Sequence, residues 1–157
     1  MNIFYLDDDP KTCAEMHCYK HVVKMILETA QMLSTAHRLS ETTQAPFVYK
    51  TTHANHTSTK RLRSSQIAYQ WSLAHFQALF AEYKYRYGRV HKTQREKLRY
   101  LKVVPQDLPE LPFEAPPQCM YDECRGIDTV EAYRTYYRTR RNEIQMQWTK
   151  REAPQWL

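Results

Sequence analysis

A chain of 157 residues, with 42% hydrophobic and 25% charged residues, is long enough to bury a core and has the balance of a folded domain, which excludes intrinsic disorder. Two glycines are too few for a glycine-rich loop around a phosphate, so P-loop and dinucleotide-binding enzymes are excluded. The formal charge of +6 and the twelve tyrosines suit a nucleic-acid partner, because cations contact phosphates and aromatic rings stack on bases.

The sequence also predicts where in the cell the protein is found. No apolar run approaches the ~20 residues of a membrane helix, so no membrane partner is predicted. The first ten residues lack the basic and apolar regions of a secretory signal. We therefore expect a cytoplasmic protein of the host cell, with its four cysteines as reduced thiols.

The first predicted element is Asn2–Leu6, a short strand or at least an extended segment, which is rich in β-forming residues and ends at three aspartates. Asp9 and Pro10 then predict a helix start, with a carboxylate at the N-cap and proline at the first helical position. Asp7 lies beside this start. It either assists the capping or points into a site near His17, where it would act in catalysis.

The stretch Lys11–Arg38 predicts one long helix that is apolar on most of its sides. On a helical wheel of about 100° per residue, its other side chains fall on one narrow polar line: Cys13, His17, His21, Lys24, Glu28, Gln31 and Thr35. Since a mostly apolar helix is usually buried, this polar line must be satisfied inside the protein. We expect His17, His21, Lys24 and Glu28 to line one polar pocket, although a solvated polar face is the alternative.

The segment Ser40–Lys60 is polar, contains a proline and shows no helical period. It predicts a long loop with a short strand at Phe47–Lys50. Long loops in compact domains are often functional. Three polar residues that cluster in this loop are candidates for substrate binding: His53, Asn55 and His56.

A second long helix is predicted over Leu62–Gly88, with Gly88 as its C-cap. Glu82 and Arg86 have the i,i+4 spacing of an ion pair. Candidates for substrate contact on this helix are Trp71, Glu82, Arg86 and Tyr87.

The C-terminal half predicts a short basic helix over Val90–Leu101, then a strap, then a last helix that begins after Asp128. The strap, Val104–Pro117, contains five of the eight prolines and must be extended. Basic and aromatic residues of segments 84–102 and 134–151 would supply a surface for DNA. The fold class is therefore mainly α: a single helical domain, residues 1–157, with a short N-terminal strand and a proline-rich strap.

Three kinds of chemistry fit the polar line. In a DNA glycosylase with lyase activity, Lys24 would form an imine with the sugar, while Glu28 or an N-terminal aspartate would assist water or the sugar cation. In a metal-dependent nuclease, a divalent ion would be held by histidines: His17, His21, His53 and His56. The third alternative is an adaptor that binds nucleic acid or a host protein without catalysis.

A structural zinc site is a further alternative for the same residues. Cys13, His17 and His21 follow one another at i, i+4 and i+8, and thiolate and imidazole are good zinc ligands. Cys119 and Cys124 would complete such a site. The glycosylase alternative needs no cofactor, whereas both metal alternatives need a divalent ion.

The sequence also resembles a small family of phage and other mobile genomes. Similar segments are the opening MNIFYLDDDPKTCAEMHCYKHVVKMILETAQMLSTAHR and the motifs THANH, EYKYRYGRVH, EAYRTYY and WTKREAPQW, which together cover most of the chain. The family has an acidic residue where this chain has Tyr19, and a tryptophan near Arg61–Arg63. The resemblance implies a phage-type protein.

A second resemblance concerns the order of elements. A helix that begins with His17, followed later by Glu82, Arg86 and Gly88, is similar to the layout of phage pyrimidine-dimer DNA glycosylases. Those helical enzymes flip nucleotides and use the amine that is exposed by removal of methionine. This chain begins Met1-Asn2 and should retain its methionine, so that nucleophile is not reproduced. The resemblance favours base excision on DNA.

Overall fold

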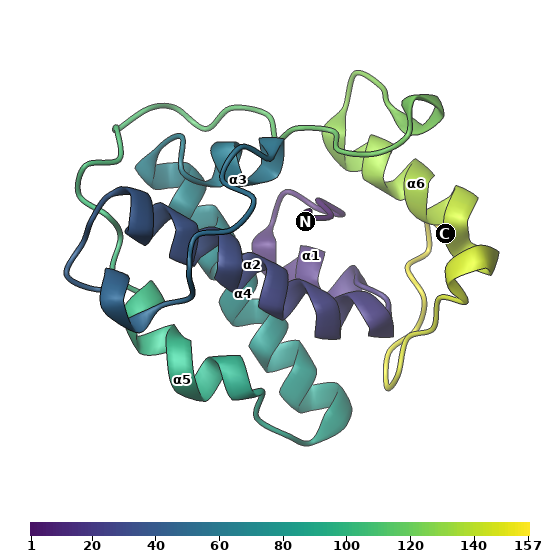
Figure 1. The fold of residues 1–157 in the computed structure, drawn as a ribbon. Helices are drawn as coiled ribbons and strands as arrows, with labels where there is room; N and C mark the ends of the chain where they lie inside the picture. The colour runs from purple at the N-terminus through teal and green to yellow at the C-terminus, as the bar shows by residue number, and fades with distance from the viewer.

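Six α-helices and two short 3₁₀ helices form along the chain, in a computed structural model that describes all residues 1–157 (Figure 1). The α-helices are α1 (Pro10–Met16), α2 (Tyr19–Leu39), α3 (Thr57–Leu62), α4 (Gln66–Tyr87), α5 (Lys92–Leu101) and α6 (Thr129–Ile144), and the 3₁₀ helices are η1 (Ala45–Phe47) and η2 (Asp122–Cys124). The predicted mainly α class is confirmed.

The predicted N-terminal strand is wrong, because no strand forms in the chain. Ile3 and Leu6 are fully buried, so the segment is inserted among the helices rather than laid beside another strand. Its backbone N–H groups bond to side chains: that of Asn2 donates to Glu28, and that of Leu6 lies 3.3 Å from the Cys13 sulfur. The apolar composition indicated burial, but burial against helices needs no strand ladder.

The second predicted strand, Phe47–Lys50, is also wrong. Pro46 stands at the start of η1, and the carbonyls of Val48 and Tyr49 accept hydrogen bonds from the Arg38 guanidinium on α2. The long loop also ends earlier than predicted. Helix α3 begins at Thr57, where His56 caps it by accepting from the Ser58 N–H.

The predicted long helix is broken into α1 and α2 at His17 and Cys18, which have extended backbone angles. The His17 side chain bonds to the Cys13 carbonyl, with 2.7 Å between Nδ1 and the oxygen. The guanidinium of Arg86 on α4 donates to the carbonyls of Glu15 and His17, at 2.9 and 2.8 Å. These side chains satisfy backbone groups that a continuous helix would pair by itself, so the break is stable.

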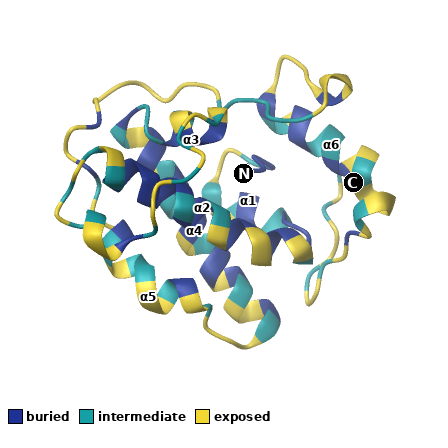
Figure 2. Ribbon diagram, in the orientation of Figure 1, coloured by how far each residue is buried: buried dark blue, intermediate teal, exposed yellow.

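The core lies between α2 and α4, with α1 packed on α4. Fully buried side chains there include Ile26 and Leu33 of α2 and Phe76 and Leu79 of α4. Helix α2 is not buried on all its apolar sides, because Val23 and Leu27 are more than 40% exposed. Figure 2 shows buried residues concentrated where these helices meet.

The prediction for the C-terminal half is confirmed in its main features. No regular structure forms over Val104–Pro117, and Asp128 caps α6 by accepting from the Glu131 N–H. Helix α6 lies on the other side of the N-terminal segment from α3 (Figure 1), and its Tyr133 and Tyr137 rings pack against Phe4. No helix combines the length and hydropathy needed to cross a membrane.

Candidate active-site groove

Glu28 ties the N-terminal segment to the middle of α2. Its carboxylate accepts a hydrogen bond from the Asn2 backbone N–H at 2.9 Å and lies 3.6 Å from the amino group of Met1. The same carboxylate lies 3.4 Å from Nζ of Lys24, one turn earlier on the helix. The Glu28 side chain is only 14% exposed, so it is a largely desolvated carboxylate between two amino groups.

The Asn2 side chain joins three further parts of the chain at this place. Its Oδ1 accepts from the Ser58 hydroxyl at 3.2 Å and lies 3.0 Å from the Tyr133 hydroxyl. Its Nδ2 donates to the Cys119 carbonyl at 3.0 Å. A single amide therefore fixes α3, α6 and the end of the strap around the N-terminal segment.

Beside Asn2 lies an open groove of about 700 Å³, which we call the N-terminal groove. Phe4 and Tyr136 lie with their ring centroids 5.7 Å apart, and Tyr121 stacks on Tyr136 at 6.3 Å. The groove is lined by Asn2, Phe4, His56, Thr57, Pro117, Gln118, Cys119, Met120, Tyr121, Arg125 and Tyr136. Its volume lies within the range of small-molecule sites, and its walls combine aromatic rings with polar groups.

His56 is the histidine of the groove wall. Partial burial lowers its pKa, the nearby amino terminus and His53 lower it further, and Glu28 opposes them. Its Nδ1 accepts from the Ser58 N–H, so a neutral ring carries its proton on Nε2. His56 is therefore a neutral hydrogen-bond donor near pH 7.

The four residues of the predicted pocket do not share one cavity. His17 is fully buried in the core, whereas the Lys24 side chain is 64% exposed. The break between α1 and α2 takes His17 off the helix that carries the other three. His21 stacks on Phe4 at 4.2 Å, and its Nδ1 lies 2.6 Å from the Tyr137 hydroxyl. Of the expected set, Glu28 and Lys24 remain in contact, and Glu28 is hydrogen-bonded to Asn2 of the groove wall, but neither of them lines the groove.

Asp7 lies in a different place from Glu28. It pairs with Arg134 at 3.3 Å and lines a smaller cavity of about 240 Å³ together with Trp71. The Trp71 indole N–H donates to the Asp8 carbonyl at 2.8 Å. These contacts anchor the start of α1 against α4, on which Trp71 lies.

Glu82 and Arg86 are buried and make all their described contacts within the protein. Nε of Arg86 lies 2.5 Å from Glu82, and Arg151 makes two further hydrogen bonds to the same carboxylate, at 2.7 and 2.8 Å. The Tyr87 hydroxyl donates to the Tyr19 carbonyl. This arrangement fixes the helix break and the C-terminal tail to α4, and Glu82 and Arg151 also line a separate open cavity of about 400 Å³.

The loop residues stay in one turn, in which the His56 N–H donates to the His53 carbonyl at 3.0 Å, but they do not line a site together. His53 is exposed with a positive φ of 47°, and Asn55 is exposed beside it. Only His56 of this group lines the groove. The predicted metal set of His17, His21, His53 and His56 is therefore not assembled, and neither Cys119 nor Cys124 joins a cluster of three ligands.

One cluster of potential metal ligands does form, and it includes His75, which was not predicted as a ligand. The ligand atoms of Cys13, His17 and His75 lie within 4.8 Å of one another, and all three residues are fully buried. His75 comes from α4, whereas Cys13 lies on α1 and His17 ends it. The cluster belongs to the core and is separate from the residues that line the groove.

Basic charge is distributed differently from the prediction. Four of the five arginines of α6 and the tail pair with carboxylates, Arg134 with Asp7, Arg138 with Glu131, Arg140 with Glu143 and Arg151 with Glu82, whereas Arg141 is exposed without an ion pair. The surface around α5 carries one acidic residue, Glu96, against six exposed cations: Lys84, Arg89, Lys92, Arg95, Arg99 and Lys102. Beside it, the Phe47 and Tyr100 rings stack at 4.9 Å. We call this region the α5 surface.

No protein-family model, curated protein or solved structure matches the chain. The fold and the site define its class: a basic, all-helical protein with an open aromatic groove beside a desolvated carboxylate. The function has to be argued from the groove itself.

Proposed function

We propose that the chain is a DNA glycosylase with lyase activity and that the N-terminal groove receives a nucleotide extruded from the duplex. The single observation that supports this most is that Glu28, which is hydrogen-bonded to Asn2 of the groove wall, contacts two amino groups. The Nζ of Lys24 and the amino group of Met1 lie 3.4 and 3.6 Å from this carboxylate. An amine beside a carboxylate is the pair that imine chemistry on a sugar requires.

The groove suits an extruded base for physical reasons. An enzyme that acts on a base must remove it from the stack, and the flipped base is then held by aromatic side chains and by hydrogen bonds to its edge. Phe4, Tyr121 and Tyr136 supply rings on the groove wall. His56 and Gln118 supply polar groups for the edge of the base.

The proposed reaction begins when the amine forms a bond to C1′ of the sugar as the bond from C1′ to the base breaks. The base leaves with the bonding electron pair and takes up a proton. The nitrogen loses a proton and O4′ takes one up as the bond between C1′ and O4′ breaks, which opens the ring and gives an imine. β-Elimination then removes a proton from C2′, forms a double bond between C2′ and C3′, and breaks the bond from C3′ to the phosphate oxygen, so that the phosphate leaves with the electron pair. Glu28 would stabilise the positive charge on the sugar and accept the proton from the amine.

Lys24 is the favoured amine because its exposed side chain can swing toward a bound sugar, whereas the Met1 side chain is packed against the core. Borohydride should trap the protein on DNA that contains an abasic or modified site. We expect Lys24→Ala to abolish the trapped species without unfolding the protein, because the removed side chain fills no cavity in the core. Lys24→Arg should fail as well, because a guanidinium stays protonated.

A matched variant keeps the experiment decisive. Glu28→Gln retains shape and removes the charge, so it should slow base release by roughly 10²–10⁴-fold and leave some trapping on abasic DNA. If Lys24→Ala still traps, an N-terminal Gly-Ser extension tests the amino group of Met1. Absence of trapping in the unchanged protein would contradict the proposal.

A second candidate function is binding of nucleic acid without chemistry, and the α5 surface favours it. Figure 1 places α5 and α6 on opposite sides of the molecule, so the α5 surface does not reach a nucleotide in the N-terminal groove. If the protein only binds nucleic acid, substitutions on the α5 surface should remove binding, whereas substitutions of Glu28 should leave binding intact. In the glycosylase proposal, changes at Glu28 remove catalysis from DNA that still binds.

A further inference from the structure

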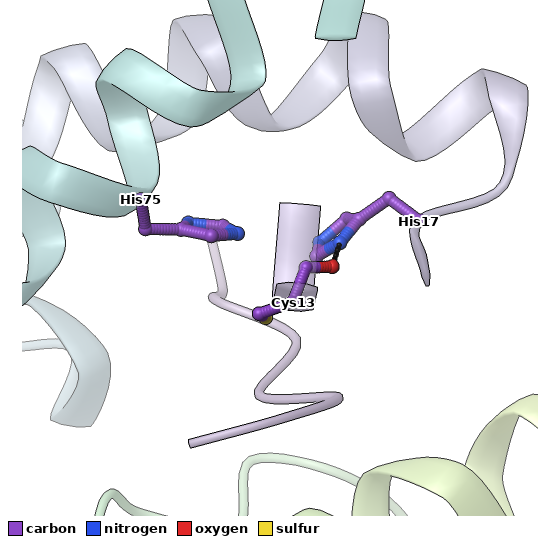
Figure 3. Close-up of side chains that lie close together, drawn as sticks. All are labelled: Cys13, His17 and His75. Carbon is purple, nitrogen blue, oxygen red and sulfur yellow. Dashed lines mark hydrogen bonds between the residues drawn. The ribbon is translucent and has the colours of Figure 1, made fainter. Parts of the chain in front are cut away.

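The three buried side chains of Cys13, His17 and His75 converge on one point between α1 and α4 (Figure 3). Cys13 and His17 have the spacing i, i+4, which places them on one side of α1 and its C-cap, as in the paired histidines of known zinc motifs. His75 faces them from the middle of α4. Thiolate and imidazole are the ligands that zinc prefers, and each is offered here by a fully buried side chain.

The hydrogen bonding of the cluster leaves its histidine nitrogens free, whereas the Cys13 thiol donates to the Phe4 carbonyl at 3.2 Å and burial raises its pKa, so metal binding would have to displace this proton. His17 Nε2 and both ring nitrogens of His75 are buried and have no hydrogen-bond partner. Buried polar atoms are nearly always satisfied in native proteins, because desolvation without a partner costs free energy. Two lone pairs, one from His17 Nε2 and one from His75, therefore lie unpaired beside one sulfur, which points to a ligand that accepts them.

Hydrogen bonds from neighbouring groups also orient the ligand atoms of the cluster, as they do in metal sites. His17 Nδ1 lies 2.7 Å from the Cys13 carbonyl, so this nitrogen carries the proton and Nε2 presents its lone pair. The Leu6 N–H points at the Cys13 sulfur at 3.3 Å, which would stabilise a thiolate. Burial holds both histidines neutral and lowers the pKa of His17 to about 4, and a neutral ring is the form that binds a metal.

We propose that Cys13, His17 and His75 bind one divalent ion of the zinc class, which joins α1 to α4. Tetrahedral bonds of 2.0–2.3 Å would place the ligand atoms roughly 3.3–3.6 Å apart, so side-chain shifts of about 1 Å close the site. A water molecule would complete the four ligands. Because every protein ligand is fully buried, the ion has a structural role and stands apart from the proposed imine chemistry.

Such an ion would compensate for a weakness of the fold. Helix α1 has only seven residues, and isolated helices of this length do not persist in water. It is held to α4 by packing and by the hydrogen bonds of Arg86. A metal bridge would add a direct bond between the two helices.

Titration with Co²⁺ tests the site, because cobalt adopts the zinc geometry and reports its ligands by absorption. Protein that has been reduced and stripped with a chelator should bind one equivalent of Co²⁺. It should show a thiolate-to-cobalt charge-transfer band together with the visible bands of a tetrahedral ion, and Zn²⁺ should displace the cobalt. Cys13→Ser should remove the charge-transfer band, and His75→Gln should weaken affinity at least tenfold.

Cys18→Ser is the matched control, because Cys18 is a fully buried thiol one residue past His17 that does not belong to the cluster. It should keep one equivalent of cobalt and the charge-transfer band. X-ray absorption of the unchanged zinc-loaded protein gives a second measurement if a variant does not fold, and one sulfur with two imidazole nitrogens is expected. Failure to bind near one equivalent, or binding that survives both Cys13→Ser and His75→Gln, would overturn the proposal.

Discussion

At the scale of single residues, buried histidines define much of the interior. His37 on α2 shows how such a residue is satisfied: its Nε2 lies 2.9 Å from the Tyr69 hydroxyl, and its Nδ1 lies 2.8 Å from the Thr42 hydroxyl. The Tyr69 hydroxyl donates to the Leu101 carbonyl, so it accepts from Nε2–H of His37. One neutral ring thus connects α2, α4 and the end of α5.

This connection predicts a loss of stability in acid. Burial lowers the pKa of His37 to about 4, although the nearby Asp107 opposes the shift. Between pH 6.5 and 4 the unfolded chain binds a proton at this site and the folded protein does not. The contribution of neutral His37 is therefore full above pH 6.5 and is lost as the pH falls toward 4.

Denaturant unfolding at pH 7 and pH 4.5 checks this prediction. The unchanged protein should lose more free energy of unfolding between these two pH values than His37→Gln, which cannot titrate. An equal loss in both proteins would assign the acid sensitivity to other groups.

Some residues of the site could be predicted from the sequence, and others could not. Glu28 and Lys24 were predicted to act together because they lie one turn apart, and their contact is at 3.4 Å. Asn2 and Tyr136 were missed, because their importance depends on long-range contacts that no local pattern records. His75 had a signal: it lies four residues before the buried Leu79 on α4, so its burial could be predicted from helical spacing, although its partners could not.

At the scale of elements, most helices follow from local signals. Asp9 and Pro10 begin α1, Asp128 caps α6, and Gly88 ends α4 with a φ of 66°, which glycine adopts without steric cost. The break at His17 was not predictable from the helical period, since the apolar spacing continues through it. It depends on Arg86, which lies 69 residues away in the chain.

Arg86 predicts a large stability effect. Arg86→Ala removes the hydrogen bonds to the carbonyls of Glu15 and His17 and leaves Glu82 with only Arg151, so we expect a loss of about 3–5 kcal/mol. Arg86→Lys should also destabilise the protein, because an ammonium cannot reproduce the planar fork.

Arg138→Ala is the matched control for this prediction. Arg138 pairs with Glu131 on the surface of α6, and such exposed pairs contribute about 1 kcal/mol or less. Thermal and denaturant unfolding of the three variants gives the comparison. A small effect of Arg86→Ala would mean that the helix break is maintained by packing alone.

At the scale of the whole molecule, positive charge lies in two separate regions. The N-terminal groove holds Arg125 on its wall, and Arg140 lies over the Tyr121 ring at 5.2 Å. The α5 surface carries six exposed cations, of which Lys92 pairs with Glu96. A duplex that places one nucleotide in the groove would meet the α5 surface only with its flanking phosphates or by bending.

Salt dependence measures how far this charge contributes. DNA affinity should fall at least roughly tenfold between 50 and 200 mM salt, because each neutralised phosphate releases counterions. The double variant with Arg95→Ala and Lys102→Ala should reduce the slope of log affinity against log salt by up to about 2 if both cations contact phosphates. Affinity that does not change with salt would exclude DNA as the partner.

The proposed function requires an amine beside Glu28 to attack a sugar in the N-terminal groove. The most direct test is peptide mapping by mass spectrometry of the adduct that borohydride traps on DNA with an abasic site. We predict that the reduced sugar is attached to Nζ of Lys24, the favoured one of the two amines that contact Glu28. An adduct on a lysine of the α5 surface, such as Lys92 or Lys102, or no adduct at all, would contradict the account.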